Sequence, residues 1–254
     1  MTASVRSVVS LDSSDRARSI RERILSKPFL KRFYEERYDE FRRCLERAPQ
    51  GGMAVEIGSG AGFLKTVLPI VTTSDVLPYD GVDRVLDATR LDLPNASVRA
   101  VYLFDVLHHI PDAEAFFSEL DRVLVPGGRV LITDQYVGWI SKWILKYAHH
   151  EPFDDRTERW SFETSGPLSG ANGALSWIVF FRDRARFKKL YPRLAIASVK
   201  RHSPFRYWIS GGLKAWSLAP GILFGFWSIV DAWTAAVFPK AASFFSVELV
   251  KTAD

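Results

Sequence analysis

Hydrophobic and polar residues alternate in blocks along the middle of the chain, and these blocks predict strands separated by helices or turns. Short apolar runs bounded by glycine, proline or an acidic residue are typical of strands that are buried on both faces. Five strands are predicted, at residues 54–57, 70–75, 82–86, 98–104 and 129–133. Apolar residues of 112–124 recur every three or four positions, which predicts an amphipathic helix with Asp112 as its N-cap. Such alternation builds a parallel sheet with right-handed crossovers.

Two helices are predicted ahead of this region. Residues 13–15 are suited to begin a basic helix that runs to about Leu25, and Pro28 is placed to begin a second helix. Large apolar side chains recur every three or four residues in the second helix: Phe29, Phe33, Tyr34, Tyr38, Phe41 and Leu45. We expect this stripe to pack on the core or to cover the edge of a ligand cleft. Residues 1–50 would then form an N-terminal helical cap.

The second half of the chain predicts two more helices, two more strands and a long apolar segment. The helices are expected at 139–147 and 182–191, and the strands at 194–200 and 243–250. The apolar segment covers residues 205–239. Within it, residues 215–238 contain a single charged residue, Asp231, and are long enough for the ~20 residues of a membrane-spanning helix.

Two arguments oppose a membrane span in the segment 205–239. Pro220, Gly221 and Gly225 interrupt it, and a span would separate the last predicted strand from its sheet. We expect instead a hydrophobic hairpin that covers a substrate cleft, or an anchor on a membrane surface. The second alternative rests on tryptophans that accompany basic residues, as at a membrane interface. They are Trp208, Trp216, Trp227 and Trp233, with Arg201, Arg206 and Lys214.

Composition narrows the class of protein. The 254 residues, with 47% hydrophobic and 25% charged residues, are typical of a folded globular chain of one large domain. The single cysteine, Cys44, excludes an internal disulfide and a cysteine-rich metal site. The N-terminus lacks the apolar core of a signal peptide, which favours a cytoplasmic protein. The net charge of +5 comes from scattered basic residues, and no nucleic-acid module is present, so no nucleic-acid partner is expected.

A glycine-rich turn follows the first predicted strand of the alternating region. Glu56 stands just before a GxGxG pattern formed by Gly58, Gly60 and Gly62, with Ser59 inside the turn. A strand, a glycine turn and a helix together let backbone N–H groups approach a ligand closely. The dinucleotide fingerprint requires a glycine at position 63, where this chain has phenylalanine.

Acidic residues and histidines stand near the ends of the other predicted strands. Asp75 ends the second strand, where a carboxylate can accept hydrogen bonds from ribose hydroxyls. His108 and His109 follow the fourth strand, and either is a candidate general base. No third ligand stands near these two histidines in sequence, so no metal site is expected. Residues 149–151 (His-His-Glu) and the Gly- and Ser-rich stretch 165–175 are expected to lie at a substrate pocket.

Three stretches resemble the class I S-adenosylmethionine (SAM) methyltransferases. They are Glu56 with its GxGxG turn, Asp87-Ala88 followed by Leu-Asp-Leu-Pro at 91–94, and LDRVLVPGGRVLITD at 120–134. The resemblance implies an α/β, doubly wound, mostly parallel seven-stranded sheet of order 3-2-1-4-5-7-6, with strand 7 antiparallel and helices on both faces. It implies one domain over 1–254, with the SAM-binding core at 53–134 and the substrate-side elaboration and last two strands at 135–254.

The resemblance also implies the residues that contact SAM. An acid followed by alanine reaches the adenine amino group, and Asp87 is preferred to Asp83 for this role. A backbone carbonyl of Phe104 or Asp105 contacts the amino group of the cofactor's methionine part. The full set of expected cofactor contacts is Glu56, Gly58, Ser59, Gly60, Gly62, Asp75, Asp87, Ala88, Phe104 and Asp105. The candidate catalytic residues are His108, His150 and Asp105.

The sequence indicates the methyl donor better than the acceptor. Aromatic-rich flanks favour a small-molecule or lipid-like acceptor, including a lipid-linked one, and a cytoplasmic enzyme that is peripheral to the inner face of the membrane. Two other functions stay open. A nicotinamide-dependent oxidoreductase uses a similar turn, and a non-catalytic SAM-binding, membrane-associated protein would keep residues 53–134. The oligomeric state is left open by the sequence.

Overall fold

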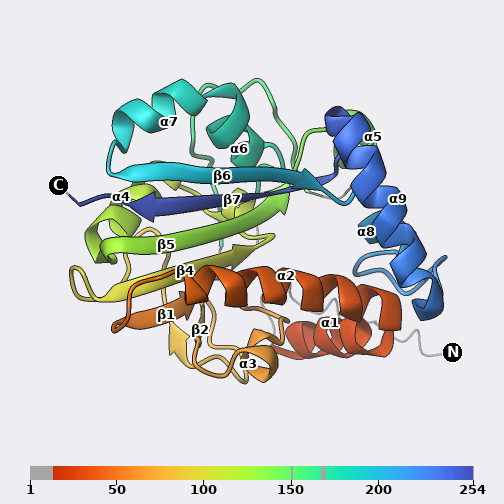
Figure 1. The fold of residues 1–254 in the computed structure, drawn as a ribbon, viewed down its shortest axis with the longest axis horizontal. Helices are drawn as coiled ribbons and strands as arrows, with labels where there is room; N and C mark the ends of the chain where they lie inside the picture. Colours follow the sequence, from red (N-terminus) through yellow and green to blue (C-terminus); the bar gives the residue numbers. More distant parts are fainter. Residues whose placement is uncertain (1–13, 150, 167–169, 254) are drawn as a thin grey trace, which may run out of the picture.

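The computed structural model describes residues 14–149, 151–166 and 170–253, and within them seven strands form one sheet (Figure 1). The strands are β1 (Met53–Glu56), β2 (Thr72–Asp75), β3 (Arg84–Val85), β4 (Val98–Phe104), β5 (Leu124–Gln135), β6 (Leu194–His202) and β7 (Phe244–Lys251). Their order is β3-β2-β1-β4-β5-β7-β6. The first five pair in parallel, whereas β7 runs antiparallel to both β5 and β6. The predicted order and the antiparallel seventh strand are confirmed.

Helices surround this sheet. They are α1 (Ser14–Ser26), α2 (Pro28–Glu46), α3 (Leu64–Val67), α4 (Ala113–Val123), α5 (Trp139–Tyr147), α6 (Leu175–Trp177), α7 (Arg184–Leu190), α8 (Arg206–Ile209) and α9 (Phe224–Val237). Four other helical turns are η1 (Leu107–His109), η2 (Ile178–Arg182), η3 (Gly221–Leu223) and η4 (Pro239–Ala241). Pro28 opens α2 at its first turn, and the carboxylate of Asp112 caps α4 by accepting from the N–H of Ala115 at 2.9 Å.

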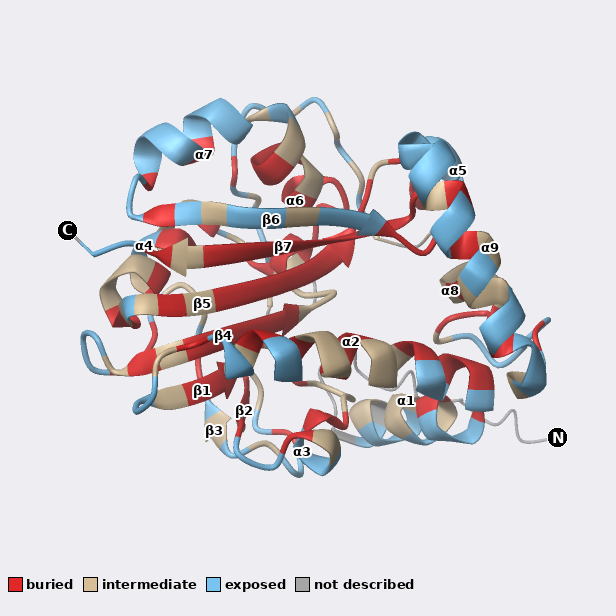
Figure 2. Cartoon of the chain, in the orientation of Figure 1, coloured by how far each residue is buried: buried red, intermediate tan, exposed pale blue. Residues whose placement is uncertain are grey.

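Side chains that alternate along the strands form a core on each face of the sheet. Val101 and Val130 point to the face covered by α4, α6 and α7, where Phe117 lies edge-on to Phe187. Tyr102 points to the opposite face, where its ring stacks on Phe41 of α2 at 4.8 Å between centroids. Figure 2 shows β4, β5 and β7 buried along most of their length, and β6 exposed at the edge. Burial on both faces explains why the central strands read as continuous apolar runs.

Some element boundaries differ from those predicted. β5 begins at Leu124 rather than 129, because the chain turns directly from α4 into an extended segment that pairs with Val98 across a register shift. The Pro-Gly-Gly stretch is therefore an irregularity within the strand, with Gly127 at φ +77°. The helix after the glycine turn, α3, is only four residues long.

The apolar segment 205–239 forms α8, a loop, η3 and α9 rather than a single helix or a regular hairpin. Pro220 and Gly221 separate its two helices, as their conformational preferences predict. In the part of the chain that is described, no helix is long and apolar enough to cross a membrane. Figure 1 shows α5, α8 and α9 together at one end of the sheet, beyond the arrowheads of β5 and β6.

Candidate active site

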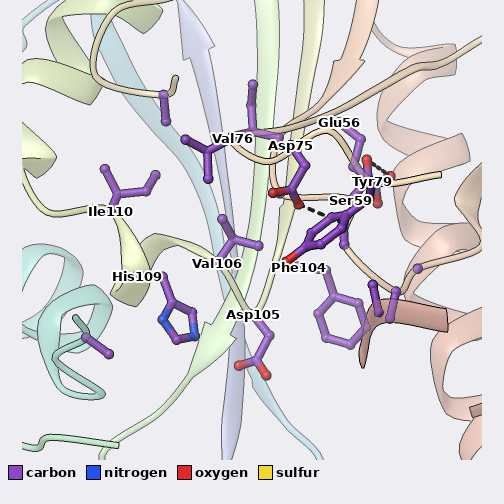
Figure 3. A pocket seen from close by; sticks show the side chains of 18 of the residues that line it. Glu56, Ser59, Asp75, Val76, Tyr79, Phe104, Asp105, Val106, His109 and Ile110 are labelled. Atoms are coloured by element: carbon purple, nitrogen blue, oxygen red, sulfur yellow. Dashed lines mark hydrogen bonds between the residues drawn. The ribbon is translucent and has the colours of Figure 1, made fainter. Parts of the chain in front are cut away.

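A cavity of about 530 Å³ lies at the carboxyl ends of β1, β2 and β4. The strand order reverses between β1 and β4, and ligands of open α/β sheets bind at this kind of switch point. All ten residues predicted to contact the cofactor lie on its wall. Figure 3 shows Glu56, Ser59, Asp75 and Tyr79 on one side of the cavity, with Asp105 and His109 further along it.

The glycine turn brings backbone close to the ends of two neighbouring strands. Gly58 has φ +71°, and a Cβ there would lie 2.6 Å from the side chain of Val106, so only glycine fits. Gly60 has φ +44°, and its N–H donates to Asp75 Oδ2 at 2.9 Å. The turn after β1 is thereby fixed to the carboxylate that ends β2.

Two buried carboxylates support this turn. Ser59 Oγ donates to Glu56 Oε2 at 2.6 Å. Burial raises the pKa of Glu56 to about 7; the bond from Ser59 opposes this rise and the charge of Asp75 adds to it. Burial also raises the pKa of Asp75, although the N–H groups of Leu77 and Gly60 stabilise its charged form. Each oxygen of Asp75 accepts one of these bonds and retains capacity for another.

The two acids considered for the adenine end lie in different places. Asp87 lies on the cavity wall beside Ala88, and its carboxylate accepts from Thr89 N at 2.8 Å. Asp83 does not line the cavity. Its carboxylate binds Lys65 and the N–H of Thr73, and the Lys65 bond lowers its pKa. The structure therefore gives Asp83 a role in fastening β3 to the neighbouring elements.

Asp105 has an unusual backbone at the end of β4. Its φ is +59°, which a non-glycine residue rarely adopts, and its N–H donates to Thr133 O at 2.8 Å. The side chain lines the cavity and accepts from Gln135 Nε2 at 3.2 Å. Burial raises the pKa of Asp105 to about 7, opposed by the charge of His108. Strain of this kind and a shifted pKa are both typical of functional positions.

The two adjacent histidines take different positions relative to the cavity. His108, which is among the candidate catalytic residues, is only 1% exposed and is not on the cavity wall, because the short turn η1 directs its ring inward. His109 lines the cavity instead. Burial lowers the pKa of His109 to about 4, and the charge of His108 adds to this effect. His150, the other candidate histidine, lies outside the described residues.

A network of buried polar groups holds His108 in place. Its Nδ1 donates to Asp134 Oδ1 at 2.7 Å, and Asp134 Oδ2 accepts from Ser176 Oγ at 2.7 Å. Burial opposes a charge on the ring, but Asp134 and Glu151 outweigh it and raise the pKa of His108 well above its ordinary value. Sequence reasoning missed Asp134, although its place at the end of β5 could have indicated a role.

Segments far apart in sequence complete the wall. Glu151 lies 3.5 Å from His109 Nε2, and Gly170 and Ala171 lie beside them. A third polar group, which the sequence did not lead us to expect, therefore lies beside the two histidines, although it is more than forty residues away along the chain. Residues of α1, including Ile20 and Ile24, close another side. From the apolar segment 205–239 only Leu213 reaches the cavity. The prediction that a hairpin in this segment covers the cavity is therefore wrong.

Comparisons with known proteins agree with this architecture. Residues 55–132 match the family model described as a methyltransferase domain. Among solved structures, geranyl diphosphate C-methyltransferase from Streptomyces coelicolor A3(2) matches at 14% identity, with 88% of this chain and 81% of that chain covered and a TM-score of 0.53. A chain in the complex of the Haloferax volcanii Trm112 methyltransferase activator with its methyltransferase matches at 15% identity, with 92% and 98% covered and a TM-score of 0.51.

A third structure, geranyl diphosphate methyltransferase in complex with SAM, matches at 15% identity, with 88% of this chain and 87% of that chain covered and a TM-score of 0.51. The search of curated proteins found no match. Residues 55–132 therefore match a methyltransferase domain, in a chain with the Rossmann-like methyltransferase fold. These findings support an enzyme that uses SAM as methyl donor. The antiparallel β7 also separates it from nicotinamide-binding sheets, whose order is 3-2-1-4-5-6.

Proposed function

We propose that the protein methylates a small, amphipathic acceptor that binds in the same cavity as SAM, next to Asp105 and His109. The observation that carries this proposal is the continuity of the cavity. One wall connects the glycine turn, Asp75 and Asp87 to Asp105, His109 and Glu151. A donor end and an acceptor end are thus provided within reach of each other, which is the main requirement for direct methyl transfer.

The donor end has the groups that this cofactor needs. Gly58 and Gly60 leave backbone bare at the turn, Asp75 would accept from the ribose hydroxyls, and Asp87 with Ala88 would hold the adenine. The carbonyls of Phe104 or Asp105 would orient the amino group of the methionine part. When bound, SAM supplies a methyl group that its sulfonium makes electrophilic.

At the acceptor end, Asp105 is the best-placed group to move a proton. Its pKa of about 7 lets the carboxylate accept a proton from an acceptor hydroxyl or amine near neutral pH. His108 does not reach the cavity and, in this proposal, positions the wall rather than acting as the base. The cap formed by α1 and α2 excludes water with Ile20, Ile24 and Tyr34.

We expect the enzyme to bind such an acceptor at a membrane surface. Large apolar side chains on α5, on α9 and in the loop before α9 are exposed: Trp139, Ile140, Trp143, Tyr147, Trp216, Leu218, Ile222, Leu223, Phe226, Ile229, Trp233, Val237 and Phe238. Ile222 is 88% and Ile229 73% exposed. We call this set the α5–α9 face. Both helices contact η4, and they lie at the end of the sheet where β4 and β5 end (Figure 1).

The charges around the α5–α9 face favour anionic lipid. Lys142, Lys146, Lys214 and Lys240 are exposed on its elements. The one acid between 205 and 243, Asp231, is buried and binds Arg206 at 2.8 Å. Exposed tryptophans with lysines beside them are typical of proteins that lie on a membrane interface. We therefore propose that the enzyme docks peripherally and takes its acceptor from the lipid phase.

One experiment tests the methyl transfer. The protein is incubated with methyl-labelled SAM and an extract of the native host, which is then separated into lipid and aqueous fractions. We expect label in a lipid-phase or amphipathic product. SAM binding without label in any fraction would favour the non-catalytic alternative, and absence of SAM binding would refute the cofactor assignment.

Vesicle flotation tests the membrane contact separately. We expect the protein to float with anionic liposomes, and the double variant Trp139→Ser/Trp233→Ser to float less. The exposed Arg156→Ser serves as the surface control. No flotation of the wild type would refute the docking.

A further inference from the structure

Two histidines and a glutamate meet at the acceptor end of the cavity. His108 Nε2 lies 3.4 Å from Glu151 Oε2, and His109 Nε2 lies 3.5 Å from Glu151 Oε1. One ligand atom from each of the three residues lies within 4.8 Å of the other two. The methyl-transfer chemistry proposed above uses neither of these two contacts.

The hydrogen bonds made by the two Nδ1 atoms determine the protonation of the two Nε2 atoms, which face Glu151. A carboxylate and a carbonyl can only accept, so His108 Nδ1 must donate to Asp134 and His109 Nδ1 must donate to Gly170 O at 3.4 Å. In the neutral rings both Nε2 atoms are then lone-pair acceptors, and both face the same carboxylate. Acceptors that face each other repel unless a proton or a metal ion lies between them.

This arrangement is the one found around metal-bound histidines. A ligating histidine usually donates its other N–H to a carboxylate or a backbone carbonyl, which fixes the ring and its tautomer. Asp134 and Gly170 supply one partner of each kind, and Ser176 in turn holds Asp134. His108 Nε2 is buried and has no hydrogen bond within the described part of the chain.

The distances fit an ion. A tetrahedral ion with bonds of ~2.0–2.1 Å keeps its ligand atoms about 3.4 Å apart. His108 Nε2 lies 3.4 Å from Glu151 Oε2 and His109 Nε2 lies 3.5 Å from Glu151 Oε1, so each ring is at this separation from one oxygen of the carboxylate. A second possible group, Asp105, His108 and Asp134, fits less well. There the 2.7 Å between His108 Nδ1 and Asp134 is a hydrogen-bond length and leaves room only for a proton.

We propose that His108, His109 and Glu151 bind one divalent transition-metal ion, of the zinc type, whose open side faces the cavity and takes an oxygen of the methyl acceptor. Imidazole and carboxylate ligands suit such ions. His108 is the inner ligand, while His109 and Glu151 line the cavity. A hydroxyl bound to the ion loses its proton more readily, and Asp105 on the same wall can accept that proton. This inference rests on the proposed methyl transfer for the identity of the oxygen ligand.

The test uses the full chain, treated with chelator and titrated calorimetrically with Zn²⁺ and, for its absorption spectrum, with Co²⁺. We expect one ion per chain and a tetrahedral cobalt spectrum. Glu151→Gln and His109→Gln should each weaken binding at least ~10-fold, and Asp134→Asn should weaken it ~10-fold through the orientation of His108. Glu158→Gln, an exposed acid of the same segment, is the matched control and should change nothing.

SAM binding, measured on the same variants without metal, shows whether they fold and tests the proposed function independently. Equal metal affinity in the wild type and in Glu151→Gln would overturn the inference, as would absence of binding. In either case the cluster holds a proton between His108 and Glu151 instead of an ion. Retained SAM binding would then leave the methyltransferase assignment intact, whereas metal binding without SAM binding would overturn only that assignment.

Discussion

The proposed donor end and the proposed acceptor end of the cavity are built in different ways. At the donor end, backbone groups and acids follow directly after β1, β2 and β4, so that neighbouring residues in the sheet meet at one edge. At the proposed acceptor end, η1 and the segment after α5 contribute side chains, and the loop before α6 contributes a backbone carbonyl. Topology alone fixes the donor end, whereas the acceptor end depends on loop packing and is free to vary between enzymes of this fold.

The largest expected effect is the loss of methyl transfer on replacement of Asp105, a residue proposed to act on the acceptor and not to determine SAM affinity. Replacing Asp105 with Asn removes the proton acceptor but keeps a polar side chain beside Gln135, so methyl transfer should fall ~10²–10⁴-fold while SAM affinity changes little. Because Asp105 must be ionised to accept a proton, kcat/KM of the wild type should rise with pH through its pKa of about 7. Steady-state kinetics across pH 5–9 checks this. An unchanged pH profile in Asp105→Asn would show that another group is the base.

Glycine substitutions sharpen the account of the donor end. Gly58→Ala adds a clash with Val106 to the strain of a positive φ, so the free energy of unfolding should fall by about 2–5 kcal/mol. Gly51→Ala is the matched control, because Gly51 has φ +81° but no atom within 4 Å of a Cβ. It should cost only about 1 kcal/mol. Denaturant unfolding measures both, and equal losses would mean that the close approach to Val106 is unimportant.

The buried acid of the glycine turn should make stability depend on pH. Since the folded-state pKa of Glu56 is about 7, above its unfolded value near 4.5, ionisation favours unfolding, and the cost grows as pH rises from about 4.5 to 7. Relative to Glu56→Gln, the wild type should lose about 1–3 kcal/mol across this window. Unfolding curves at several pH values test the difference. Parallel behaviour of the two proteins would show that Ser59 holds Glu56 ionised throughout.

The sequence predicted the donor end of the cavity well and the acceptor end poorly. Apolar runs at 98–104 and 129–133 specify buried strands by local pattern alone, and β4 and β5 cover them. The acids at the strand ends could be placed because parallel strands end at one edge, and Asp75 and Asp87 lie on the cavity wall.

The positions of Glu151, His108 and the segment 205–239 depended on tertiary contacts that no local sequence pattern encodes. The approach of Glu151 to His109 needs the chain to return from α5 across the end of the sheet, and the burial of His108 depends on the direction of one short turn. The sequence of the apolar segment 205–239 was consistent both with a hairpin that covers the pocket and with an anchor on a membrane surface. Only its tertiary position shows that Ile222 and Ile229 remain exposed while Leu213 alone reaches the cavity.

The most direct test of the central claim, that one cavity has a donor end for SAM and a separate acceptor end, is calorimetric titration of SAM into the wild type, Asp75→Ala and Glu151→Gln. The account predicts one SAM per chain, a loss of ~1–3 kcal/mol of binding free energy in Asp75→Ala through unpaired ribose hydroxyls, and little change in Glu151→Gln. Asp83→Ala, outside the cavity, should also bind SAM like the wild type. Equal weakening in Asp75→Ala and Glu151→Gln, or unchanged affinity in Asp75→Ala, would contradict it.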